Sequence, residues 1–185
     1  MKTRRFLTAA VLMGVMAMFT SCSKSDDNSG GGSIPSAPDV TPVSANYTYT
    51  ATIVPSMLDY VDVTVDYYDE SGKVKTEKIT DKEWKKSFTT KLPVTIAARL
   101  NLSLKSDIED YTKFDYIRIE SFIAAEGGLQ NKAGGTVGGI IQKDGSNWLE
   151  IPGENFEKFI TELGSGYRKF FIEYDAAGKK TEGSW

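Results

Sequence analysis

The sequence predicts a mainly β protein, an antiparallel immunoglobulin-like sandwich with one short helix. Three patterns support this prediction: apolar and polar residues alternate along several segments, glycine-containing turns separate these segments, and only one segment has helical spacing. The segments amount to about eight to ten short strands at roughly 8–15-residue spacing, which is typical of such sandwiches. A barrel, or an α+β sheet packed on the helix, are the alternatives.

The clearest strands are predicted at 58–68 and 94–105. In the first, one face carries Val61, Val63, Val65 and Tyr67, and the other carries Tyr60, Asp62, Thr64, Asp66 and Tyr68. In the second, one face carries Val94, Ile96, Ala98, Leu100, Leu102 and Leu104. Because a one-residue slip would move every apolar group of a face into water, both registers are strongly specified. We expect the apolar faces to form the core.

A longer strand is predicted at 113–125, with Ile117, Ile119 and Ile123 on one face and Phe114, Tyr116 and Phe122 on the other. Since both faces are partly apolar, this strand is expected to be central or covered. Shorter strands are predicted at 47–54, 74–80, 84–92, 136–142, 148–151, 167–174 and 179–185.

Glycine-containing turns connect these strands. The turns at 69–73 and 175–179 share an Asp at the start and a Gly-Lys at the end, and the glycine-rich segment 127–135 is predicted to be a third turn. We interpret the similarity of 68–73 to 174–179 as shared turn chemistry rather than as a duplicated unit. One amphipathic helix is predicted at 154–163, where Phe156, Phe159, Ile160 and Leu163 have helical spacing.

The composition excludes several classes of function. The chain of 185 residues contains no histidine and one cysteine, so Ser-His-Asp and Cys-His catalysis, the usual zinc sites and an internal disulfide are all excluded. The formal net charge is −3, and an acidic balance argues against nucleic acid as a partner. No cofactor is expected, and the chain is predicted not to be an enzyme.

The first 21 residues have the layout of an export signal. Lys2, Arg4 and Arg5 precede an apolar run from Phe6 to Phe19, and small residues then lead to Cys22. The run has about 14 residues, fewer than the roughly 20 that a helix needs to span the hydrocarbon core of a bilayer. Residues 19–22, Phe-Thr-Ser-Cys, resemble the lipobox of bacterial lipoproteins, although Leu is usual where Phe19 stands. The resemblance implies a signal peptide at 1–21, cleavage before Cys22 and lipidation of that cysteine.

The segment after Cys22 is predicted to be a flexible tether at 22–44. Residues 23–28, Ser-Lys-Ser-Asp-Asp-Asn, resemble the acidic tether of Bacteroidota-type surface lipoproteins, which implies an outer-membrane protein facing the cell exterior. A glycine-rich run and three prolines follow, and such a composition forms a spacer rather than a packed structure. The folded domain is therefore predicted at 45–185.

Few residues suggest a specific site. Tyr60, Asp62, Asp66 and Tyr68 share one strand face, where aromatic rings beside carboxylates favour a sugar-binding platform, and cross-strand packing is the alternative. Asp62 and Asp66 are about 13 Å apart along a strand, too far for a glycosidase pair. The carboxylates between Asp107 and Asp115 lack the spacing of a calcium loop, so no metal site is predicted.

These observations predict where the protein is located better than what it binds. The first hypothesis is a lipid-anchored, non-catalytic surface module that binds a glycan or a protein. The alternative is a structural or accessory subunit of a surface appendage or envelope assembly. Exposed aromatic residues in a groove would favour binding, and an unpaired edge strand would favour assembly.

Overall fold

The computed structural model describes residues 37–145, 148–163 and 165–185. The predicted signal peptide and Cys22 lie outside the described residues, as does most of the predicted tether. The described residues form a compact unit, and its buried core residues lie between Ala45 and Tyr174.

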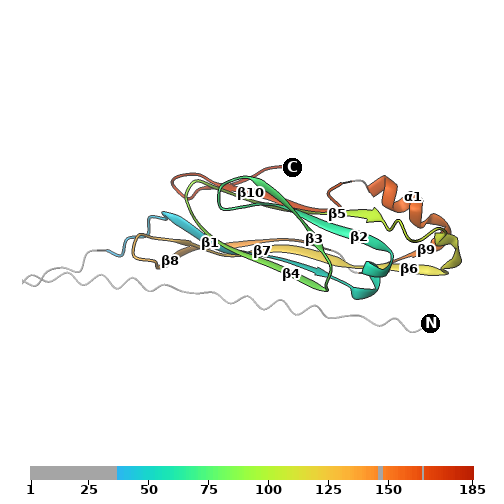
Figure 1. Cartoon of the computed structure of the whole chain (residues 1–185). Coiled ribbons are helices and arrows are strands. Elements are labelled where there is room, and N and C mark those ends of the chain that lie inside the picture. Colours follow the sequence, from blue (N-terminus) through green and yellow to red (C-terminus); the bar gives the residue numbers. More distant parts are fainter. Residues whose placement is uncertain (1–36, 146–147, 164) are drawn as a thin grey trace, which may run out of the picture. The chain divides into compact units, whose positions relative to one another are not determined.

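The described unit is a mainly β, antiparallel sandwich with one α-helix, as predicted (Figure 1). Sheet A has the strand order β4-β1-β7-β8, and sheet B has the order β11-β10-β5-β2-β3. The strands of sheet A are β1 (Ser44–Ile53), β4 (Glu83–Lys91), β7 (Ser121–Gln130) and β8 (Thr136–Gly145). Those of sheet B are β2 (Val61–Tyr68), β3 (Val74–Ile79), β5 (Val94–Leu104), β10 (Arg168–Tyr174) and β11 (Lys180–Glu182).

A small ribbon and the helix lie beyond one end of the two sheets. The ribbon pairs β6 (Tyr116–Ile119) with β9 (Leu149–Pro152), and α1 (Gly153–Leu163) follows directly. Two short 3₁₀ helices, η1 (Pro55–Asp59) and η2 (Tyr111–Lys113), complete this region. We call it the distal end, because the first described residues, from Ala37, lie at the opposite end of the sandwich (Figure 1).

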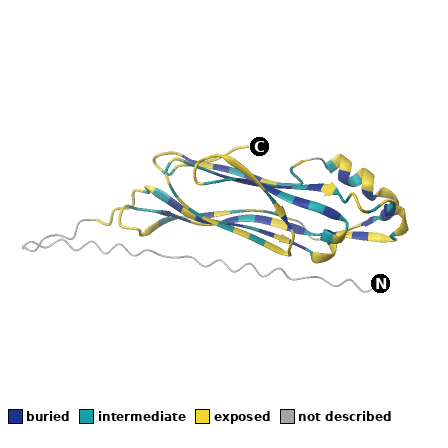
Figure 2. Cartoon of the chain, in the orientation of Figure 1, coloured by how far each residue is buried: buried dark blue, intermediate teal, exposed yellow. Residues whose placement is uncertain are grey.

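The core fills the space between the sheets (Figure 2). The predicted inward faces of β2 and β5 are confirmed: Val61, Val63, Val65 and Tyr67 are buried, as are the apolar residues of β5 from Ile96 to Leu102. Rings of β1 bridge the layers, since Tyr49 lies 5.8 Å from Tyr67 and 6.3 Å from Phe170 between ring centroids. At the distal end, Phe156 of α1 packs on Tyr111 and seals the core.

Three hairpin turns cluster at the end opposite the ribbon, which we call the tether end. In each turn, an Asp or Asn side chain accepts hydrogen bonds from the N–H groups two and four residues later, and a glycine has a positive φ. The residues are Asp69 with Gly72, Asn131 with Gly134 and Asp175 with Gly178. Asn131 also donates to the Asp39 carbonyl at 2.6 Å and thereby holds the entering chain. The two turns at 69–73 and 175–179 thus have the same hydrogen bonds and the same positive-φ glycine, as their similar sequences predict.

The prediction of a single strand at 113–125 is wrong. The chain forms β6 and β7 instead, which belong to different sheets, and it turns at Glu120, whose carbonyl accepts the Val54 N–H at 3.0 Å. The predicted alternation of faces holds across the break: Ile117, Ile119 and Ile123 are all buried. Alternation identifies which side of a chain faces the core, but not which neighbour it pairs with.

The turn predicted at 127–135 is shorter than expected, because β7 continues to Gln130 and only 131–135 turns. Gly127 is part of the strand, where a Cβ would collide with the β1 backbone at Asn46. The predicted strand at 58–68 also begins late, at Val61, since Pro55 starts a 3₁₀ turn that includes Leu58. The predicted helix at 154–163 is confirmed, one residue longer at its start.

Candidate functional site

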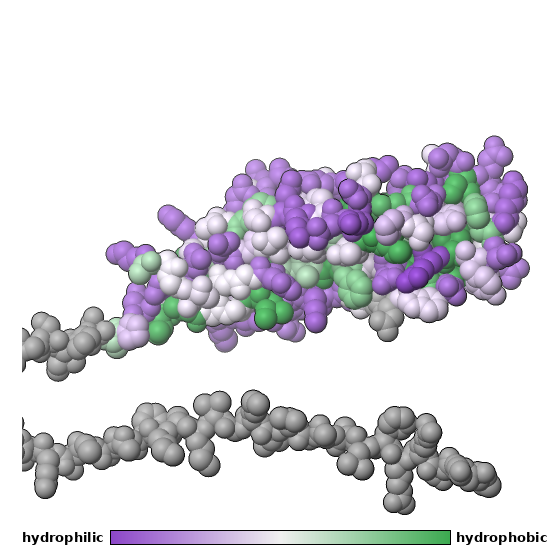
Figure 3. Space-filling view, turned by 90° about the horizontal axis from the view of Figure 1, so that it is seen from below, coloured by the Kyte–Doolittle hydropathy of each residue, from purple (hydrophilic) through white to green (hydrophobic). Residues whose placement is uncertain are grey.

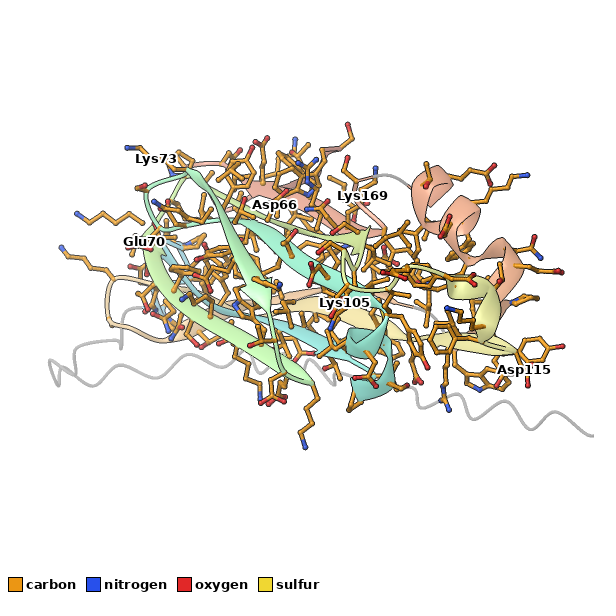
Figure 4. All side chains as sticks on the ribbon, turned by 45° about the vertical axis from the view of Figure 1, so that its right-hand side comes forward. Asp66, Glu70, Lys73, Lys105, Asp115 and Lys169 are labelled. Atoms are coloured by element: carbon orange, nitrogen blue, oxygen red, sulfur yellow. The ribbon has the colours of Figure 1, made fainter. Side chains whose placement is uncertain are left out.

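The four residues of the predicted platform do not form one open surface. Tyr60 packs edge-on against Phe114, with ring centroids 4.9 Å apart, beneath the distal elements. Asp62 is ion-paired with Lys78 at 2.8 Å. Asp66 and Tyr68 lie further along the outer face of sheet B, where Figure 4 shows Asp66 near the middle of the sheet. Tyr60 is therefore separated from Tyr68, the other aromatic ring of the predicted platform, which packs against Trp185.

Asp66 belongs to a structural network. The residue is only 7% exposed, and its carboxylate accepts hydrogen bonds from Thr76 at 2.6 Å, from Arg99 at 2.8 Å and from Asn101 at 3.0 Å. Burial acts to raise the pKa of Asp66, but these three donors outweigh it and the pKa is lowered overall. The carboxylate is therefore held ionised and occupied by protein donors.

Trp185 covers this network from outside. Its indole N–H donates to the Phe170 carbonyl at 3.1 Å, and the Arg99 guanidinium lies 4.6 Å from the centroid of its ring. The Tyr68 ring packs against the same indole at 5.3 Å. The final residues of the chain thus occupy the aromatic part of the predicted platform.

The aromatic residues exposed most strongly lie at the distal end instead. Tyr116 is 65% exposed and Trp148 is 51% exposed, and Phe122 is 43% exposed on the outer face of sheet A. The residues between them are charged: Arg118 stacks over Trp148 with its Cζ 5.3 Å from the ring centroid, and it pairs with Glu120 at 2.7 Å. We call these five residues the distal surface.

The alternation of β6 and β7 places this surface on one side. Tyr116, Arg118, Glu120 and Phe122 are every second residue along the chain, and they alternate with residues that are buried. Trp148 reaches them because β9 pairs with β6, with Glu150 opposite Arg118. Seen from the outer side of sheet A, the molecule shows hydrophobic and hydrophilic side chains intermixed (Figure 3).

A small cleft adjoins the distal surface. Its volume is about 230 Å³, and its lining is mostly apolar. The lining residues are Thr52, Ile53, Val54, Pro55, Lys82, Glu120 and Phe122. Gly145 lies directly under the Phe122 ring, where any side chain would collide with it. The absence of a side chain at Gly145 thus allows the Phe122 ring to pack against the backbone of β8 beside the cleft.

A larger concavity of about 530 Å³ lies at the tether end, and its lining includes Asp69, Glu70, Glu173 and Asp175. Asp69 and Asp175 in its wall accept the hydrogen bonds that close their own turns. In the loop between Asp107 and Asp115, the Asp110 carboxylate caps η2. It accepts hydrogen bonds from the N–H group and the hydroxyl group of Thr112. In the parts of the chain that the structure describes, no three acidic, histidine or cysteine side chains are placed to hold a metal ion.

The sequence contained part of the signal for the distal surface. The alternation put Tyr116 and Phe122 on one face, opposite the buried isoleucines. It gave no indication that Trp148, which comes later in the chain, would join them, because that depends on the pairing of β6 with β9. The predicted third member of the face, Phe114, is half-buried against Tyr60.

Comparisons with known proteins give no family for this chain. No protein-family model, no curated protein and no solved structure matches it significantly. Within the described residues, no helix has the length and apolar character needed to cross a lipid bilayer.

Proposed function

We propose that this protein is a lipid-anchored lipoprotein of the outer membrane, exposed to the exterior, whose sandwich domain binds carbohydrate through the distal surface. The observation that carries the proposal is the position of the most exposed aromatic rings. They lie at the end of the described unit opposite Ala37, where the tether enters. The distal surface therefore lies at the end of the described unit away from the point where the chain enters it.

The chemistry of the distal surface suits a carbohydrate. The C–H face of a sugar ring packs on a flat aromatic ring. Tyr116 and Trp148 are both exposed, and Arg118 lies over one face of the Trp148 ring. Glu120 and Glu150 are placed beside these rings to accept hydrogen bonds from sugar hydroxyls, and Arg118 can donate to ring or hydroxyl oxygens. Aromatic anchors with a few oriented polar groups are the usual makeup of small-molecule sites.

The charge distribution favours a neutral sugar over an acidic one. Two carboxylates, Glu120 and Glu150, stand beside the single guanidinium of Arg118, which already pairs with Glu120. The interruption of the aromatic residues by charged ones also argues against a large protein interface, whose centre is typically depleted of charged groups.

Glycan-array binding tests this proposal. The chain from residue 22, with Cys22→Ser to prevent lipidation, is expected to bind a restricted set of neutral glycans. Trp148→Ala and Tyr116→Ala should each weaken that binding by about tenfold, a loss of about 1.4 kcal/mol. Val74→Ala is the matched control, because Val74 is an exposed apolar residue on an edge strand of sheet B.

Three results would contradict the proposal. Binding to no glycan on an array of neutral and acidic structures would remove the ligand class. Glycan binding that persists unchanged in the double variant Tyr116→Ala, Trp148→Ala would move the site away from the distal surface. Binding to acidic glycans alone would contradict the assignment to neutral sugars.

A further inference from the structure

The four edge strands of the two sheets differ in how they are protected from pairing with another chain. An exposed edge offers backbone N–H and C=O groups to any extended strand, and charged side chains are a common protection. β3, β4 and β11 each carry several charged residues: Lys75, Glu77 and Lys78; Glu83, Lys85, Lys86 and Lys91; Lys180 and Glu182. These three edges are therefore protected.

β8 is the exception. It pairs only with β7 in the described part of the chain, and its first seven residues, from Thr136 to Gln142, contain no charged side chain. Ile141 on its outer side is 71% exposed, the largest exposed fraction among the large hydrophobic residues of the described chain. A long, uncharged edge with an exposed isoleucine is the form that sheets usually avoid.

Side chains of β8 that face the core are held by sheet B. Asp144 accepts a hydrogen bond from the Lys169 N–H at 2.9 Å, and Gln142 accepts one from Lys180 at 3.4 Å. These contacts fix the position of β8 from inside the sandwich. In the described part of the chain, no strand pairs with the outer edge of β8. The backbone N–H and C=O groups along that edge therefore stay available to an extended strand of another chain.

We propose that β8 pairs with β8 of a second copy of this chain, antiparallel and about a two-fold axis at Ile141. In that register Ile141 faces Ile141 of the second copy, and the two exposed side chains cover each other. Lys143 then faces Gly139 and Asp144 faces Gly138, so every charged residue of the strand is opposite a glycine. Like charges do not meet anywhere along the pair.

The two-fold arrangement has a simple consequence for the sheets. The four strands of sheet A continue across the axis into sheet A of the second copy, and both copies use the same surface, as expected of a closed dimer. A single paired edge is a small interface, so we expect a weak dimer with a dissociation constant in the micromolar range. The two copies point in opposite directions, and their tether ends are far apart.

This inference is independent of the proposed carbohydrate site, and disulfide trapping tests it. The chain from residue 22 with Cys22→Ser contains no cysteine. Adding Ile141→Cys should give a disulfide-linked dimer under mild oxidation, because directly opposed residues of antiparallel strands bring their Cβ atoms close enough to bridge. Val74→Cys, exposed on the charged edge strand β3, is the matched control and should stay largely monomeric.

Analytical ultracentrifugation provides the second measurement. The cysteine-free chain should show a concentration-dependent dimer, and Ile141→Lys should weaken it at least tenfold by placing two like charges opposite each other. Val74→Lys should leave it unchanged. Since Ile141 is mostly exposed, the fold should survive, and circular dichroism together with the milder Ile141→Thr checks this point.

Two outcomes would overturn the proposal. One is a monomer at every concentration up to about 1 mM together with no more cross-linking of Ile141→Cys than of Val74→Cys. The other is a dimer that Ile141→Lys does not affect, since the pairing would then use another surface.

Discussion

The hydroxyl group of Tyr49, on β1 of sheet A, accepts a hydrogen bond from the backbone N–H of Ala97, on β5 of sheet B, at 3.1 Å. The same hydroxyl donates to the Tyr68 carbonyl of β2 at 3.2 Å. The last pair of the β2–β5 ladder is Tyr67 with Ala98, so Tyr49 supplies partners to backbone groups where that ladder ends. Tyr49 is fully buried, and burial is the main cause of the strong upward shift of its pKa.

We expect Tyr49→Phe to lower the free energy of unfolding by about 1–3 kcal/mol, because it leaves a buried N–H without its partner. Urea denaturation followed by circular dichroism measures this change. Tyr116→Phe is the control. Because the Tyr116 side chain is exposed, removal of its hydroxyl group leaves no buried polar group without a partner. Equal midpoints for wild type and Tyr49→Phe would show that the cross-layer hydrogen bond is not needed for stability.

Gly127 and Gly139 should respond to alanine in opposite ways. A Cβ at Gly127 would collide with the backbone of β1 at Asn46 and Tyr47, which cannot move without breaking the β1–β7 ladder. A Cβ at Gly139 meets no atom within 4 Å. Gly127→Ala is therefore expected to destabilise by about 1–3 kcal/mol, whereas Gly139→Ala should be neutral or stabilise by up to about 1 kcal/mol.

Thermal unfolding by calorimetry distinguishes the two variants. A Gly127→Ala protein as stable as wild type would mean that β7 ends before this residue. It would favour the original prediction that Gly127 belongs to a turn.

Glu77 should make stability depend on pH in the acid range. Burial acts to raise its pKa, but hydrogen bonds from Tyr67 at 2.7 Å and Trp84 at 2.9 Å, together with Lys86, lower it to about 2. A carboxyl whose pKa is lower in the folded state stabilises that state above its unfolded pKa, near 4.5. This contribution is lost as the pH falls from about 4.5 to about 2.

Chemical denaturation at a series of pH values checks this prediction. The free energy of unfolding should fall over that range, and Glu77→Gln should make the fall shallower without abolishing it, because Asp66 acts in the same direction. About a third of the Glu77 side chain is exposed, so solvent screening keeps the effect modest. Glu157→Gln, on the exposed side of α1, is the control. Parallel pH curves for wild type and Glu77→Gln would contradict the assignment.

Cys22→Ala should abolish membrane association. Removal of the thiol removes the attachment point for the acyl chains, and two or more chains are needed for stable anchoring. The measurement is the fraction of protein in the membrane pellet, with Ser23→Ala as the control that keeps the thiol. Mass spectrometry of wild type should find a lipid-modified amino terminus at residue 22. An intact leader, or an unchanged membrane fraction in Cys22→Ala, would refute the lipid anchor.

The sequence by itself determined the local structure and the faces of its strands. The alternation of Val61 to Tyr67 and of Val94 to Leu104 was sufficient, because a pleated strand with one buried face admits a single assignment of side chains to core and solvent. The turns at Asp69 and Asp175 were also local, since an Asx side chain and a glycine with positive φ close a turn using only nearby backbone.

Only the tertiary structure decided which strands are neighbours. The division of 113–125 between two sheets, the burial of Asp66 beneath Trp185 and the meeting of Trp148 with Arg118 all depend on pairings between distant segments. Periodicity contains no information about such partners, because any strand of suitable facing can satisfy the same backbone hydrogen bonds. The two aromatic rings predicted from one strand, Tyr60 and Tyr68, are therefore covered by different neighbours, Phe114 and Trp185. The exposed aromatic residues come instead from β6, from β7 and from the residue that precedes β9.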